Sequence, residues 1–229
     1  MKGALFCLIL FWTLFILISV FCVGKLLQHD ITQKTEYACK NCKIKLEYYK
    51  SNYDNEIYKD CYFDSLLYSY NYRGLIRRLL LDYKFKNKKY IHRFLAQSMQ
   101  QQVQDFFKYS TNYIDYIIPV PISYFRFLER GYNQSSLLAK YISNNTKIPV
   151  LEFVLIKVMH NKKQSNLSHH DRVLNTKGVY KVLFKSAING KSLLLIDDIY
   201  TTGATVNECA RVLKQAGAKR VFVLVCARA

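Results

Sequence analysis

One stretch near the carboxyl end constrains the fold of this chain more than any other. Residues 192–196 form an apolar run that ends at two adjacent carboxylates, Asp197 and Asp198. A short apolar run that stops at charge is typical of a strand buried on both faces, as in a parallel sheet. Apolar residues then recur at helical spacing from Val206 to a stop signal at Gly217. The sequence therefore predicts a strand–turn–helix unit of an α/β fold.

The turn between this strand and this helix is suited to binding an anion. It consists of Thr201, Thr202, Gly203, Ala204 and Thr205. Threonine hydroxyls and the N–H groups at a helix start donate hydrogen bonds, and a glycine lets a ligand approach the backbone. The two carboxylates just upstream lie where open α/β sheets place their ligands, and they suit ribose hydroxyls or Mg²⁺. An ordinary acidic turn between a core strand and a helix is the alternative.

The middle of the chain predicts further elements and a basic loop. Residues 72–84 and 90–107 carry apolar residues at helical spacing, which predicts two amphipathic helices. Residues 113–120 are β-branched and aromatic, and they predict a strand that enters a stiff Pro-Val-Pro turn. Arg126 and Arg130 follow this turn, and their planar guanidinium groups suit pyrophosphate oxygens.

The charge of the chain is strongly positive, with 34 basic and 16 acidic side chains and a net charge of +18 among 229 residues. Such a surface attracts polyanions, including phosphorylated ligands, nucleic acid and anionic lipid. The basic residues are spread along the chain, so a solvated lysine-rich surface is an equal alternative. The apolar content of 51% excludes a disordered protein.

The amino-terminal residues 4–23 carry no charge. Their length is sufficient for a helix to cross a bilayer core of about 30 Å, which predicts a membrane anchor within residues 1–24. More lysines follow this segment than precede it, so the rest of the chain is expected on the cytoplasmic side of the inner membrane. A cleaved signal peptide, a start codon placed too far upstream and a hydrophobic helix packed on the domain are the alternatives.

The seven cysteines are odd in number, which argues against a disulfide framework and indicates a reducing compartment. Cys39, Cys42 and Cys61 have nearly the spacing of a zinc site, but the fourth thiol is missing. Asp64 or His29 could complete the ligand set. A degenerate module that has lost its metal is an equal alternative.

The predicted strand, acidic pair and Thr/Gly turn resemble the phosphoribosyl pyrophosphate (PRPP) signature of the type I phosphoribosyltransferases. Tyr200 stands where an aliphatic residue is usual. The resemblance implies that Asp197 and Asp198 bind the ribose hydroxyls with Mg²⁺ nearby. It also implies that residues 201–205 enclose the 5′-phosphate.

A narrower resemblance, to the ComF/GntX family, runs from about Cys39 to the last residue. The motifs that carry it are Pro119-Val-Pro121, Arg126, Arg130-Gly-Tyr-Asn-Gln134, Gln164-x-x-Leu167, Arg172-x-x-Asn175 and the Asp-Asp loop. The resemblance implies that the turn after Ile118 is the pyrophosphate loop, where Arg126 and Arg130 would bind, and that residues 157–175 form a loop that closes over PRPP. Arg172 is a further candidate for contact with the pyrophosphate, and a solvated helix residue is an equal alternative for it.

The expected architecture is an α/β type I phosphoribosyltransferase fold, with a mostly parallel sheet flanked by helices. We expect it to occupy residues 67–229. Residues 36–66 would form the degenerate zinc-ribbon-like module that family members carry, and residues 1–24 the hydrophobic helix. Asp198 is expected to be an exposed ligand carboxylate rather than a packing residue.

The family resemblance implies Mg²⁺-dependent binding of PRPP. In a catalytic protein it would be followed by transfer of the phosphoribosyl group to an acceptor, which is the reaction of a pentosyl glycosyltransferase. The alternative is a non-catalytic protein of the same fold that acts in natural competence. Such a protein would handle single-stranded DNA at the membrane, alongside a competence helicase or other DNA-processing proteins.

Overall fold

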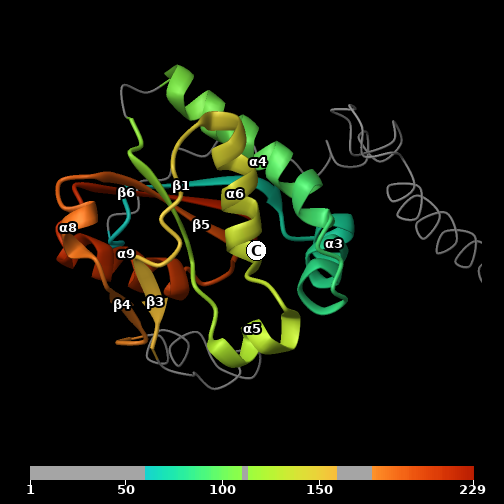
Figure 1. Ribbon diagram of the computed structural model, residues 1–229. Coiled ribbons are helices and arrows are strands. Elements are labelled where there is room, and N and C mark those ends of the chain that lie inside the picture. The colour runs from blue at the N-terminus through green and yellow to red at the C-terminus, as the bar shows by residue number, and fades with distance from the viewer. Residues whose placement is uncertain (1–59, 110–112, 159–176) are drawn as a thin grey trace, which may run out of the picture. The chain divides into compact units, whose positions relative to one another are not determined.

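The computed structural model describes residues 60–109, 113–158 and 177–229, which are drawn in colour in Figure 1. The chain divides into two compact units, residues 1–48 and residues 49–229. All the described residues belong to the second unit, so the account of the fold concerns that unit alone.

The predictions for the amino-terminal part concern residues outside the described ranges. They are the anchor at residues 4–23 and most of the module at residues 36–66. Across the three described ranges, no helix combines the length and the apolar character that crossing a membrane requires.

The described residues form strands and helices in alternation. In chain order these are β1 (Ser65–Asn71), α3 (Gly74–Phe85), α4 (Ile91–Tyr109), β2 (Tyr116–Pro119), α5 (Tyr124–Arg130), α6 (Gln134–Thr146), β3 (Leu155–Lys157), β4 (Tyr180–Val182), α8 (Lys185–Ile188), β5 (Ser192–Tyr200), α9 (Ala204–Gln215) and β6 (Arg220–Arg228).

The main sheet has the strand order β1-β6-β5-β2, and its neighbouring strands are parallel. In the register of the sheet, Leu194 of β5 lies between Ile117 of β2 and Phe222 of β6. Beyond β2, Val150 forms a further parallel bridge to Ile117. Strands β3 and β4 form a separate antiparallel pair. The expected parallel sheet is therefore confirmed, with β5 inside it.

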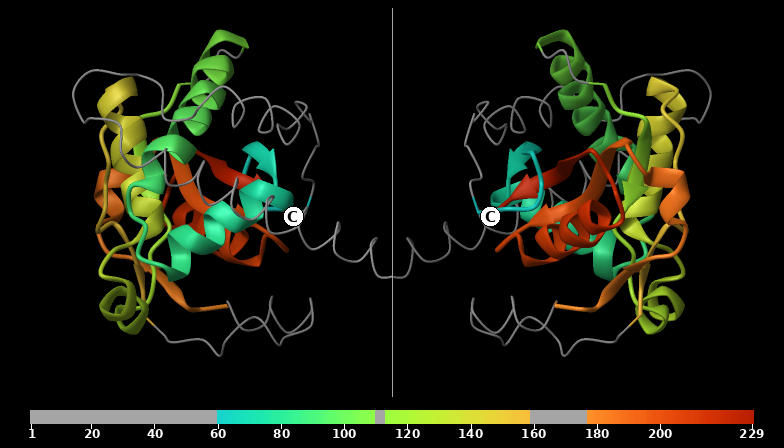
Figure 2. Two further views of the ribbon diagram at one scale, coloured as in Figure 1. Left: turned by 90° about the vertical axis from the view of Figure 1, so that its right-hand side faces the viewer. Right: turned by 90° about the vertical axis from the view of Figure 1, so that its left-hand side faces the viewer.

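Helices cover both faces of this sheet (Figures 1 and 2). Helices α4 and α6 contact each other and one face, where the Phe106 and Phe222 rings lie 4.9 Å apart. Helix α9 covers the other face, where Val206, Cys209 and Leu213 join the buried core, and β4 packs against α9. Burial on both faces explains why β5 reads as an uninterrupted apolar run.

The structure extends and corrects two boundaries. Strand β5 continues to Tyr200, four residues beyond the predicted end at Ile196, because residues through Tyr200 stay paired with β6. Strand β1 begins at Ser65, so the boundary expected between residues 66 and 67 falls inside a strand of the main sheet. Neither β1 nor β6 was among the predicted strands.

Helix α6 begins where a side chain caps it. Asn133 Oδ1 accepts a hydrogen bond from Ser135 N at 3.1 Å, and Asn133 Nδ2 donates to the Val120 carbonyl at 3.0 Å. A capping residue satisfies an N–H group that has no partner inside the helix. This one also ties the start of α6 to the end of β2, at the carboxyl edge of the sheet.

Leu194→Ala tests whether the stability of the fold depends on the burial of β5. Leu194 is fully buried, whereas Leu183 is 51% exposed and offers the same substitution as a control. We expect Leu194→Ala to lower the free energy of unfolding by about 2–5 kcal/mol, because it leaves a cavity. Leu183→Ala should change it by less than about 0.5 kcal/mol in urea titrations of both variants. Equal losses would contradict this account of the core.

Candidate functional site

A pocket of about 300 Å³ opens at the carboxyl edge of the parallel sheet. This is the edge at which open α/β sheets bind ligands. Residues from α3, α5, α6, β3, β4, β5 and the turn before α9 line it. The lining includes Lys84, Arg126, Arg130, Gln134, Ser135, Lys157, Tyr180, Asp197, Asp198, Thr201, Thr202, Gly203, Ala204 and Thr205.

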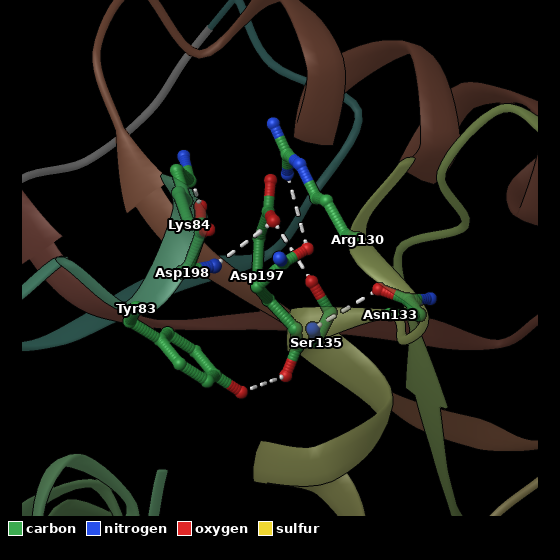
Figure 3. A network of polar contacts seen from close by, with 8 residues as sticks. Tyr83, Lys84, Arg130, Asn133, Ser135, Asp197 and Asp198 are labelled. Atoms are coloured by element: carbon green, nitrogen blue, oxygen red, sulfur yellow. Dashed lines mark hydrogen bonds and ion pairs between the residues drawn. The ribbon is translucent and has the colours of Figure 1, made fainter. Parts of the chain in front are cut away.

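The two adjacent carboxylates of β5 have different partners (Figure 3). Asp197 Oδ1 accepts hydrogen bonds from Ser135 Oγ at 3.0 Å and from the Asp198 backbone N at 2.9 Å. Asp198 Oδ1 lies 2.9 Å from Lys84 Nζ, in an ion pair with α3. Successive side chains of a strand point to opposite faces, so Asp197 contacts Ser135 of α6 whereas Asp198 contacts Lys84 of α3.

The carboxylates also differ from the expectation in their burial. Asp198 is only 5% exposed, so the prediction that it is an exposed ligand carboxylate is wrong. The physical reason is that β5 continues past it and that Lys84 reaches it from α3. Burial, and after it the neighbouring Asp198 carboxylate, raises the pKa of Asp197. Two adjacent carboxyl groups with little access to water resist carrying two charges.

The Thr/Gly turn before α9 depends on Gly203. Its φ of +76° is in the left-handed region, and a Cβ added there would lie 2.4 Å from the Tyr200 hydroxyl oxygen. The turn is further closed by a hydrogen bond from Ala204 N to Thr202 Oγ1 at 3.4 Å. Tyr200, the residue noted above as unusual, thus packs where only glycine leaves room.

The arginines of α5 form the basic wall of the pocket. Arg130 donates from a terminal nitrogen to Gln134 Oε1 at 3.1 Å, and its guanidinium lies 5.2 Å from the centroid of the Phe85 ring. Burial, and then the charge of Arg126, lowers the pKa of Arg130. Two like charges held near each other favour an anion between them.

Sequence reasoning gave no role to two residues of the pocket, Lys84 of α3 and Ser135 at the start of α6. Gln134 and Lys157 line the pocket too, and they belong to the family motif and to the start of the expected loop, respectively. Burial, and then Arg126, lowers the pKa of Lys157. Lys84 had a weak signal, as the last residue of a predicted amphipathic helix, and Ser135 had no distinguishing signal.

The donor set of the pocket fits Mg²⁺ that is held mainly by a ligand. Mg²⁺ is usually bound through one or two carboxylates together with substrate phosphates and water. The basic side chains that line the pocket supply contacts for the phosphates of such a ligand, whereas Asp198 Oδ1 is already paired with Lys84 and Asp197 Oδ1 already accepts two hydrogen bonds. In the described part of the chain, no cluster of three or more His, Cys, Asp or Glu side chains could hold a metal ion without such a ligand.

Asp64, named as a zinc ligand from the sequence, connects the segment before β1 to the start of the neighbouring strand β6. Its Oδ2 accepts a hydrogen bond from Val221 N at 2.7 Å and lies 2.7 Å from Lys214 Nζ. Its backbone N donates to the Val221 carbonyl at 2.8 Å. These contacts give Asp64 a structural role in the sheet domain.

The remaining predicted ligands divide between described and undescribed residues. Burial, and then Asp60, raises the pKa of the Cys61 thiol. Cys39, Cys42 and Arg172 lie outside the described ranges, as does His29. Zinc binding and the contact of Arg172 with pyrophosphate therefore stay predictions.

Comparison with known proteins agrees with this geometry. The phosphoribosyl transferase domain family matches residues 131–229. Competence protein F of Haemophilus influenzae is 32% identical over 193 residues, which are 83% of this chain and 84% of that protein. Competence protein ComFC of Bacillus subtilis is 31% identical over 173 residues, which are 72% of this chain and 66% of that protein.

A third relative shares a shorter region. DNA utilization protein YhgH of Escherichia coli is 31% identical over 109 residues, which are 48% of this chain and 47% of that protein. The parallel sheet flanked by helices is the type I phosphoribosyltransferase fold that the sequence predicts. The chain therefore belongs to the ComF/GntX family of the phosphoribosyltransferase superfamily.

Proposed function

We propose that the pocket binds PRPP together with Mg²⁺. The observation that carries the proposal is that the acidic pair, the Thr/Gly turn and both arginines, which are distant in sequence, line the same pocket. Each group matches one part of the ligand: carboxylates match ribose hydroxyls, the turn matches a 5′-phosphate, and guanidinium groups match a pyrophosphate. A volume of about 300 Å³ is within the usual range of small-molecule sites.

Transfer of the phosphoribosyl group would follow binding in a catalytic protein. In that reaction the bond between C1 of the ribose and the pyrophosphate oxygen breaks, and an acceptor atom bonds to C1. Arg126 and Arg130 would stabilise the charge of the leaving pyrophosphate, while Asp197 and Asp198 would hold the ribose. The chain's own residues thus position the ligand and stabilise charge, with no nucleophile required from the protein.

A second candidate function, in the handling of single-stranded DNA, is favoured by the surface of α5. This helix buries none of its side chains, and Tyr124 and Phe125 are 70% and 66% exposed. Arg126 and Arg130 of the same helix line the pocket. Exposed aromatic rings beside arginines suit stacking on unpaired bases and contacts to phosphates. The three relatives are named for competence or DNA utilization, in keeping with such a role.

The place of this function would be the inner face of the cytoplasmic membrane. The uncharged residues 4–23 support an anchor there, as does the excess of lysines after them. The proposed partners are single-stranded DNA and the helicase or other DNA-processing proteins of competence. The net charge of +18 favours such polyanionic partners.

Titration calorimetry of PRPP with Mg²⁺ tests the first proposal. We expect Asp197→Asn to weaken binding at least about tenfold, or about 1.4 kcal/mol, because an amide is a poorer acceptor for a ribose hydroxyl than a carboxylate. Asp105→Asn on α4, outside the pocket lining, is the matched control and should bind as the wild type does. Equal affinities of all three proteins would refute the assignment of the acidic pair.

The stability of Asp197→Asn should change in the opposite direction to its affinity. The raised pKa of Asp197 means that the native state binds more protons than the unfolded state between the two pKa values. Its contribution to the free energy of unfolding therefore falls as pH rises from about 4 through the folded pKa. The asparagine keeps an oxygen that accepts the hydrogen bonds of Ser135 and Asp198, and it does not ionise.

We therefore expect Asp197→Asn to have a higher Tm than the wild type at about pH 8. The increase should be about 2–4 °C for each kcal/mol that the ionised Asp197 costs the native state. The difference should shrink at about pH 5, where the native carboxyl is protonated. Differential scanning calorimetry at both pH values measures it. A variant that is less stable than the wild type at the higher pH would contradict the burial of a charge at Asp197.

Fluorescence anisotropy with a labelled single-stranded oligonucleotide tests the second candidate. Because stacking contributes about 1–3 kcal/mol per base, we expect the double variant Tyr124→Ala/Phe125→Ala to bind at least about fivefold more weakly. Phe153→Ala removes a ring that is 74% exposed but lies outside α5, and should leave binding unchanged. Equal weakening by both changes would show that α5 is no specific surface for bases.

A further inference from the structure

Lys84 forms an ion pair with one carboxylate of the acidic pair, Asp197 and Asp198. Its Nζ lies 2.9 Å from Asp198 Oδ1, and the two side chains are 22% and 8% exposed. The other titratable neighbours of Asp198 on this side are Tyr83 and Cys226, and burial raises the pKa of both, so they stay neutral. In Figure 3 the Lys84 side chain lies beside Asp198, on the side away from Arg130.

The position of Lys84 conflicts with that of a metal ion on the same carboxylate. Mg²⁺ binds oxygen at about 2.0–2.1 Å in an octahedral shell and is repelled by a nearby ammonium. Lys84 already occupies Asp198 Oδ1, while Asp197 Oδ1 accepts two hydrogen bonds.

The cations around the pocket make a metal on the acidic pair unnecessary for attracting an anion. Lys84, Arg126, Arg130 and Lys157 line the same pocket as the carboxylates of β5. An ammonium has further N–H donors beyond the one that faces Asp198. A ligand oxygen that enters the pocket beside Asp198 can therefore accept a hydrogen bond from Lys84.

We propose that Lys84 takes the place of a divalent cation at the acidic pair, pairing with Asp198 and contacting the bound ribose phosphate. The inference rests on the proposed binding of PRPP and deepens it: any Mg²⁺ that accompanies PRPP is carried by the pyrophosphate, on the arginine side of the pocket. Lys84 is thus a ligand-binding residue of the site, and the acidic pair excludes free metal.

Titration of the protein with Mn²⁺ in the absence of PRPP tests whether the acidic pair excludes free metal. The electron paramagnetic resonance signal of Mn²⁺ measures binding. Lys84→Met removes the ammonium and should create a Mn²⁺ site at least about tenfold tighter than any in the wild type. Lys84→Arg keeps the charge and should resemble the wild type. Lys86→Met, on an exposed lysine that pairs with Asp82, is the matched control and should also resemble it.

The double variant Lys84→Met/Asp198→Asn locates the new Mn²⁺ site. Loss of the gained site in this variant supports the proposal. A wild type that already binds Mn²⁺ as tightly as Lys84→Met would overturn it, as would a Lys84→Met protein without the gain. Persistence of the gained site in the double variant would overturn it too, because the ion would then lie elsewhere.

Calorimetric titration of PRPP with Mg²⁺ or with a chelator provides the second readout. Removal of Mg²⁺ should weaken binding to Lys84→Met at least about tenfold more than it weakens binding to the wild type, because only the variant needs the metal at Asp198. Equal factors for both proteins would contradict the proposal. A wild type that binds no PRPP would refute the proposed function, while the Mn²⁺ titration would still decide the role of Lys84.

Discussion

The burial of β5 is the constraint on which the rest of the structure depends. Parallel strands pair with it on both sides, and α4 and α6 on one face and α9 on the other exclude water from it. A strand in this position tolerates only apolar residues until it nears the carboxyl edge of the sheet. The acidic pair lies at this point, and the alternation of side chains turns Asp197 toward Ser135 and Asp198 toward Lys84. One strand thus fixes both carboxylates relative to both walls of the pocket.

The electrostatics of the site follow from this placement. Two neighbouring carboxylates with little access to water would repel each other strongly, and the structure resolves the conflict asymmetrically. Asp198 forms an ion pair with Lys84, whereas Asp197 accepts hydrogen bonds and has a raised pKa. Arg126, Arg130 and Lys157 line the same pocket, and their positive charges make it complementary to a multiply charged anion.

The sequence predicted those parts of the site whose residues are contiguous in the chain. The apolar run, the acidic pair and the Thr/Gly turn are contiguous, so their order alone placed them at one edge of a sheet, and the arginines followed another predicted strand toward the same edge. Lys84 could not be assigned in this way, because its partner Asp198 is 114 residues away and only the packing of α3 brings them together. The same holds for Asp64, whose backbone partner Val221 belongs to a strand that the sequence pattern did not reveal.

The short helix α5 links the two proposed functions physically. It is fixed at both ends, by the Ser123 side chain at its start and by Gly131 in the left-handed conformation at its end. Its arginines line the pocket, while its aromatic rings remain at the surface. The arginines that would contact the proposed ligand and the rings that would stack on unpaired bases therefore belong to the same seven-residue helix, so the two proposed functions share one element of the fold.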